Sequence, residues 1–88
     1  MWYVYLLYDK TQDRFYIGVT HDLKRRLAEH ARGKTKTTAK MVDFELAYYE
    51  ACRNEADAKD RERQLKTGFG RGYIRRRLAK YILEKNQN

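Results

Sequence analysis

Trp2-Tyr3-Val4-Tyr5-Leu6-Leu7-Tyr8 is the stretch of sequence that decides the fold. Every position carries an apolar or aromatic side chain, without the polar alternation of a strand that has one face in water. The stretch therefore predicts a strand that is buried on both faces. Because it is the most apolar strand of the chain, we expect it to lie in the centre of a sheet.

The segments around this strand predict a small α+β domain with the order β-β-α-β-α-α. A polar turn at residues 9–13 favours a hairpin with a second strand, and Thr20 or Asp22 can cap the helix that follows. Gly33 is expected to end that helix, Asn54 to cap the next one, and Gly68 to end it. The predicted strands and helices cover residues 2–8, 14–19, 23–32, 44–51, 55–67 and 73–84, with a flexible connection at 69–72.

Connectivity then predicts the sheet. The first helix returns the chain to the end where the second strand began, so the third strand runs parallel to the second. A fully antiparallel three-stranded sheet requires strand one in the middle, with helices covering the sheet. In the third strand, Leu46 and Tyr48 are expected on one face and Glu45, Ala47 and Tyr49 on the other.

Charge predicts a polyanionic partner. The chain has 20 Lys and Arg residues against 12 Asp and Glu, a net charge of +8, and it has 88 residues, the length of one domain. Residues 24–40 hold seven basic groups against one acidic group, and residues 61–88 hold nine against two. Such clustering is typical of proteins that neutralise phosphates and release condensed counterions. A soluble basic protein without such a partner is the alternative that charge alone leaves open. We expect one domain over residues 1–88, with a core at about 2–67 and a basic helix at 73–84.

Cysteine use and hydropathy point to the cytoplasm. Cys52 is the single cysteine, so no intrachain disulfide can form, and no Cys-x-x-Cys pair is present to hold zinc. The apolar residues 1–8 are too short for a membrane span and lack the basic leader of a signal peptide. We expect a cytoplasmic protein with no membrane partner.

Helical geometry distinguishes the charged residues that lie near the core from those that point into solvent. At about 100° per residue, Leu23, Leu27 and Ala31 mark the buried face of the first helix, and Arg26 and His30 lie on its flank. Arg25 is expected to point into solvent.

On the second helix, Ala58 and Leu65 mark the buried face, and Glu62 lies about 50° from it. A carboxylate beside a core is costly unless it is paired. A structural ion pair with Arg26, an i, i+4 pair with Lys66, or a functional role would each explain the position of Glu62.

Tyr5, Tyr16-Ile17-Gly18, Arg26, His30, Glu62 and Lys66, in this order and spacing, resemble the GIY-YIG endonuclease superfamily over roughly residues 2–67. The resemblance implies that Glu62 binds one divalent metal ion, Mg²⁺ or Mn²⁺, and that Arg26 contacts the scissile phosphate. It also implies that Tyr5 and Tyr16 flank the attacking water and that His30 belongs to the site. Gly18 would end its strand without a side chain that obstructs the substrate.

The sequence departs from the family pattern in two places. The first motif is Tyr3-Val4-Tyr5 rather than Gly-Ile-Tyr, and an asparagine common near the end of the module could be only Asn86 or Asn88, to which no role is assigned. The chain most resembles small standalone bacterial proteins whose module is like that of the nucleotide excision repair nuclease subunit, which implies DNA repair.

The leading hypothesis is therefore a metal-dependent DNA endonuclease, and a non-catalytic nucleic-acid-binding module is the alternative. A basic protein that contacts RNA or ribosomes ranks last. The remaining tyrosines and Trp2 are expected to serve packing. Expected contacts to the nucleic-acid backbone are Lys24, Arg25, Lys34, Lys36, Lys66 and Arg71.

Overall fold

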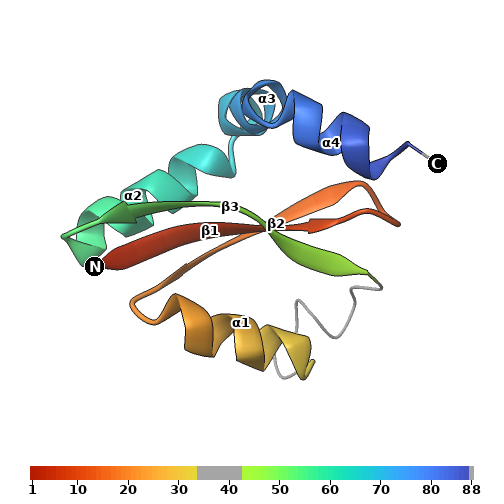
Figure 1. The fold of residues 1–88 in the computed structure, drawn as a ribbon. Coiled ribbons are helices and arrows are strands. Elements are labelled where there is room, and N and C mark those ends of the chain that lie inside the picture. Colours follow the sequence, from red (N-terminus) through yellow and green to blue (C-terminus); the bar gives the residue numbers. More distant parts are fainter. Residues whose placement is uncertain (34–42, 88) are drawn as a thin grey trace.

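The computed structural model describes residues 1–33 and 43–87, and it confirms the α+β fold (Figure 1). The elements in chain order are β1 (Trp2–Asp9), β2 (Arg14–Thr20), α1 (Leu23–Ala31), β3 (Phe44–Cys52), α2 (Glu55–Leu65), α3 (Gly68–Arg77) and α4 (Ala79–Lys85). Asp22 caps α1 by accepting a hydrogen bond from the Arg25 amide, Asn54 caps α2, and Gly33 lies beyond α1 with a φ of +68°. The expected start and end signals of α1 are thus confirmed.

The sheet has the strand order β2-β1-β3, and β1 pairs antiparallel with both neighbours. The central position of β1 is confirmed, and from Val4 to Asp9 every residue of this strand is buried. Helix α1 covers one face of the sheet, and α2, α3 and α4 lie on the other (Figure 1). Two hydrophobic clusters result, with Leu6 at the centre of one and Leu7 in the other.

A β-bulge in β3 corrects one expectation. Leu6 pairs with Tyr48 and Leu7 pairs with Leu46, so Ala47 is the extra residue between them. Tyr48 consequently packs on the side of α2 and α3, and Leu46 packs on the side of α1. The simple alternation that placed both residues on one face was wrong, because one inserted residue reverses the facing of all that follow it.

The region after α2 was also predicted incorrectly. Gly68 does not end α2 but begins α3, for which Thr67 is the cap, accepting a hydrogen bond from the Gly70 amide. Residues 69–72 are helical rather than a flexible connection, and the single helix expected over 73–84 is divided at Leu78, whose φ and ψ are −109° and 23°. Gly70 is buried, because α3 begins directly against the end of α2. The packing of the two helices therefore requires a residue without a side chain at position 70. From composition alone, the glycines of this segment indicated flexibility, because a glycine required for packing looks the same in the sequence.

Polar contacts fasten α3 and α4 to the β1–β2 hairpin. The Tyr8 hydroxyl donates to Asp13 Oδ1 over 2.7 Å and accepts from Asn86 Nδ2 over 3.0 Å. Arg75 donates to Asp13 Oδ1 and to the Asp13 carbonyl, both over 2.8 Å. Asp13 has a positive φ of 52°, in a region that aspartate tolerates in turns. Asn86 is therefore a structural contact of the buried Tyr8.

The close approach of Gly70 to α2 provides a test of this packing. A Cβ at Gly70 would overlap the Gln64 carbonyl oxygen and the Leu65 Cα, whereas a Cβ at Gly68 meets nothing within 4 Å. Gly70→Ala should lower the free energy of unfolding by about 3 kcal/mol, the upper end of overpacking costs. Gly68→Ala should change it by less than about 1 kcal/mol. Urea titrations of both variants measure the difference, and equal midpoints would contradict the packing described.

Candidate active site

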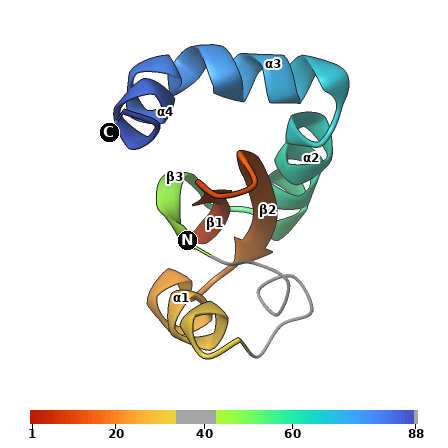
Figure 2. The ribbon, with the colours of Figure 1, turned by 90° about the vertical axis from the view of Figure 1, so that its right-hand side faces the viewer.

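A pocket of about 410 Å³ lies beside β2, between α1 on one face of the sheet and α2 on the other. Figure 2 shows the two helices on opposite sides of the sheet, of which β2 is an edge strand. Four of the residues expected at the site, one from β1, two from α1 and one from α2, line this pocket together. The complete lining is Tyr5, Ile17, Gly18, Val19, Arg26, His30, Lys59, Glu62 and Arg63.

Tyr16 and Lys66 line a second, adjoining cleft instead. This cleft has a volume of about 600 Å³ and shares Tyr5, Ile17 and His30 with the pocket. Tyr16 is on β2 between Phe15 and Ile17, whose side chains pack toward α2 and α3, while Tyr16 packs on the side of α1. Tyr5 thus lies at the junction of the two cavities, whereas Tyr16 lines only the larger cleft.

Gly18 is required by the position of Tyr5. The two residues pair across β1 and β2, and a Cβ at Gly18 would lie 2.5 Å from the Tyr5 hydroxyl oxygen and 2.6 Å from Cζ. The aromatic ring of Tyr5 therefore lies across the glycine. The expectation that Gly18 ends its strand is wrong, because β2 continues to Thr20. The absence of a side chain at position 18 makes room for the ring of Tyr5, a candidate catalytic residue.

His30 is the buried residue of α1 and is bonded to Tyr5. Its side chain is on the buried face, whereas Ala31, which helical periodicity placed there, is exposed. The Tyr5 hydroxyl oxygen and His30 Nε2 are 2.7 Å apart, and the two rings meet edge to face with centroids separated by 5.6 Å. Leu23 and Leu27 pack against the sheet as expected, so the prediction of the buried face is wrong only at Ala31, the last residue of α1.

Burial sets the ionisation of this pair. It raises the pKa of Tyr5, against the smaller lowering effect of the Arg26 guanidinium. Burial, followed by the positive charge of Arg26, lowers the pKa of His30 below its usual value. At neutral pH the phenol is therefore protonated and the imidazole is uncharged.

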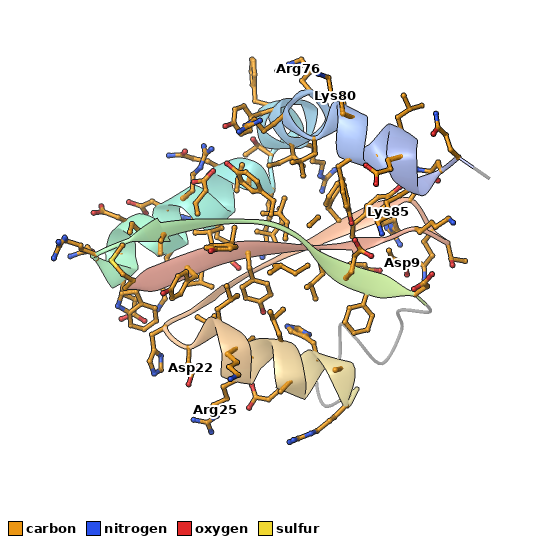
Figure 3. The ribbon with its side chains drawn as sticks, in the orientation of Figure 1. Asp9, Asp22, Arg25, Arg76, Lys80 and Lys85 are labelled. Carbon is orange, nitrogen blue, oxygen red and sulfur yellow. The ribbon has the colours of Figure 1, made fainter. Side chains whose placement is uncertain are left out.

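The two neighbouring arginines of α1 differ as the helical register predicted. Arg26 Nε donates to Glu29 Oε1 over 3.1 Å, and the Arg26 side chain is 39% exposed. The Arg25 side chain is 75% exposed and points away from the sheet (Figure 3). Only Arg26 lines the pocket, so the two residues have the same charge but different access to a bound phosphate.

Glu62 is the carboxylate of the pocket. Its side chain is 24% exposed, and Lys66 Nζ lies 3.2 Å from Glu62 Oε2. Of the two ion pairs considered for Glu62, the structure therefore forms the i, i+4 pair with Lys66, while Arg26 pairs with Glu29. Within residues 1–33 and 43–87, no group of three or more His, Cys, Asp or Glu side chains could hold a metal ion. A single carboxylate still suits Mg²⁺, which keeps most of its water and is often bound through one or two carboxylates.

The remaining expected contacts divide into three groups. Lys24 and Arg25 are exposed on α1, Arg71 is exposed and lines the adjoining cleft, and Lys34 and Lys36 lie outside the described residues. Sequence reasoning did not select Lys59 and Arg63, which line the pocket on either side of Glu62. The spacing of Lys59, three residues before Glu62, is a signal that could have identified it, whereas Arg63 directly follows Glu62 and has no such signal.

A family comparison agrees with this geometry. The family model described as the GIY-YIG catalytic domain matches residues 1–76. The chain therefore belongs to the GIY-YIG family, whose domains are nucleases that act on nucleic acids and are generally endonucleases. Comparison with curated proteins and with solved structures gave no significant match. No helix in the described part of the chain is long and apolar enough to cross a membrane.

The buried His30 predicts a pH dependence of stability. Because folding lowers the pKa of His30 from 6.5, the unfolded chain binds a proton more readily than the folded protein. The free energy of unfolding should be highest above pH 6.5 and should fall as the pH decreases from about 7 to about 5, before most carboxylates titrate. His30→Gln should flatten this part of the curve, and His21→Gln, at an exposed position, should not. Urea titrations at a series of pH values measure the free energy of unfolding of both variants. If its slope against pH in His30→Gln equals that of the wild-type protein, another group binds the proton.

Proposed function

We propose that the protein is a divalent-metal-dependent endonuclease that hydrolyses DNA phosphodiester bonds. The observation that carries this proposal is the shared pocket of Tyr5, Arg26, His30 and Glu62, which come from three separate elements. A pure binding module has no need of a carboxylate among cations that contact phosphates, because the carboxylate repels the ligand. The net charge of +8 and the exposed cations near the pocket favour a polyanionic substrate.

Arg26 is suited to hold the scissile phosphate. Phosphodiester hydrolysis increases the negative charge on the non-bridging oxygens, and a guanidinium can stabilise this charge through two parallel hydrogen bonds. The bond from Arg26 Nε to Glu29 fixes the direction of the guanidinium before the substrate arrives. Such preorganisation avoids an ordering cost during the reaction.

Glu62 would hold the metal ion. A bound Mg²⁺ or Mn²⁺ supplies charge stabilisation at the phosphate and makes a nearby water more acidic. Lys66 would have to release Glu62 for this role, and an exposed i, i+4 ion pair is weak enough to be exchanged. Lys66 is then available for a phosphate of the substrate.

Tyr5 and His30 would together accept the proton that the attacking water loses. Burial keeps Tyr5 protonated before substrate binds, so Tyr5 needs a partner that accepts its proton. His30, uncharged and 2.7 Å away, can accept the phenol proton at Nε2 when its own proton is on Nδ1. Tyr5 can then take a proton from the attacking water, and Tyr16 in the adjoining cleft would flank that water.

Removal of the charge on Glu62 tests the metal assignment. Glu62→Gln preserves the volume of the side chain, so cleavage should be lost while the fold and most DNA binding remain. Glu55→Gln is a matched control, because Glu55 forms a similar i, i+4 pair with Lys59 on the same helix. Cleavage of labelled DNA with Mg²⁺ or Mn²⁺ is the measurement, and full activity in Glu62→Gln would contradict the assignment. A wild-type protein that binds DNA without cleaving any substrate would favour the non-catalytic module.

The two arginines of α1 provide a second test. Arg26→Ala should lower the single-turnover cleavage rate by at least about 10²–10³-fold, the loss found when one oxyanion donor is removed. Arg25→Ala should slightly weaken binding and reduce its salt dependence, as expected for an exposed phosphate contact. Cleavage rates at saturating enzyme separate chemistry from binding. Equal rates for the two variants would show that Arg26 has no special role.

A further inference from the structure

The cleft of about 600 Å³ continues from the proposed catalytic pocket along the outer edge of β2 toward α3. The two cavities share Tyr5, Ile17 and His30, so a ligand in the cleft would lie directly beside the site of cleavage. Proteins use clefts of about 300–1,000 Å³ to bind small molecules and cofactors, which includes the size range of a nucleotide. The proposed reaction uses Tyr5, Tyr16, His30 and Lys66 of this cleft and leaves its part toward Arg71 and Arg75 without a role.

The charge of the cleft favours an anion. Its lining contains Arg14, Lys66, Arg71 and Arg75 against a single carboxylate, Asp13. Asp13 already accepts hydrogen bonds from Arg75 and from Tyr8, and these bonds lower the pKa of its carboxyl below the usual value. The carboxylate therefore stays ionised and bonded, and the positive charge exceeds the negative charge at this surface.

The walls favour a flat, partly apolar group rather than a phosphate alone. On the α3 side of β2, the partly exposed Phe15 and Ile17 contribute aromatic and aliphatic surface, above the buried Leu65 and Ile74, while Tyr16 lines the cleft from the α1 side. Nucleobases stack on such side chains in most sites for unpaired nucleic acid, because every base has an apolar face. Strand β2 is also an edge strand, and the outer edge of such a strand presents backbone N–H and C=O groups to which the rim of a base can bond.

We propose that this cleft binds one unpaired nucleotide next to the scissile phosphate. The base lies against Phe15 and Ile17 on the α3 side of β2, and the neighbouring phosphate lies against Lys66 and Arg71. A base held in a duplex is stacked and paired with the opposite strand, so it can enter the cleft only after leaving the stack. The inference rests on the proposed nuclease function and names its substrate class: nucleic acid with an unpaired nucleotide at the point of cleavage.

Binding in the absence of cleavage tests the cleft directly. The Glu62→Gln protein, without added metal, is titrated into fluorescently labelled DNA duplexes that are identical except for one unpaired nucleotide. We expect the duplex with the unpaired nucleotide to bind at least about tenfold more tightly, the effect of one or two additional charge-assisted or stacking contacts. Equal affinities for the two duplexes would overturn the proposal.

Two arginines of α3 provide the matched variants. Arg71 lines the cleft, whereas Arg76 lies on the side of α3 away from the sheet (Figure 3). In the Glu62→Gln background, Arg71→Ala should remove most of the preference for the unpaired nucleotide, and Arg76→Ala should retain it. A preference that is the same in both variants would overturn the assignment of Arg71 and the cleft. Far-ultraviolet circular dichroism checks that both variants are folded.

Cleavage by the wild-type protein distinguishes this proposal from the one on which it rests. If the wild-type protein with Mn²⁺ cuts the paired duplex as fast as the duplex with an unpaired nucleotide, the nuclease function stands and the cleft assignment is overturned. If it cuts neither while Glu62→Gln retains its binding preference, the cleft assignment stands and the hydrolytic function is overturned.

Discussion

The contact of Tyr5 with Gly18 and His30 is the constraint on which the rest of the site depends. Tyr5 belongs to the central strand, and its ring lies across a residue of β2 that can have no side chain. Its hydroxyl reaches His30 on α1, so one side chain joins the centre of the sheet, its edge and the helix below it. Because this pair is buried, its geometry is held by packing, and the ionisation of both groups follows from the same burial.

The open edge of β2 gives the pocket access to both layers of helices. Arg26 comes from the helix on one face, and Glu62 comes from the helix on the other. A pocket inside one layer could not bring these two groups around the same strand. A polar network holds α3 and α4 over the hairpin and consists of Tyr8, Asp13, Arg75 and Asn86. This network thereby positions the residues of α3 that line the adjoining cleft.

The ion pairs around the pocket have a common property. Lys66 with Glu62 and Arg26 with Glu29 join residues one helical turn apart, and all four side chains are partly exposed. Such pairs contribute little to stability, but they keep charged groups near the positions that a polyanionic substrate requires. An incoming phosphate or metal ion can replace one partner without the loss of a buried contact. In the proposed reaction the pair of Lys66 with Glu62 is therefore exchanged at low cost, while the bond of Arg26 to Glu29 is kept.

The sequence by itself determined the α+β class, the central strand and the caps of α1, because apolar patterning and capping signals act over a few residues. The residues expected around Tyr5 came from the resemblance of the whole motif series, and the structure brings Arg26, His30 and Glu62 into the pocket with Tyr5. Helical periodicity also distinguished Arg26 from Arg25. The tertiary structure decided what depends on neighbours distant in the chain. The bulge at Ala47 follows from pairing with β1, the buried Gly70 follows from the approach of α3 to α2, and Gly18 is explained by Tyr5 rather than by its own strand. His30 and not Ala31 is the buried residue of α1, where it contacts Tyr5 of the central strand, a partner 25 residues away that no local pattern records.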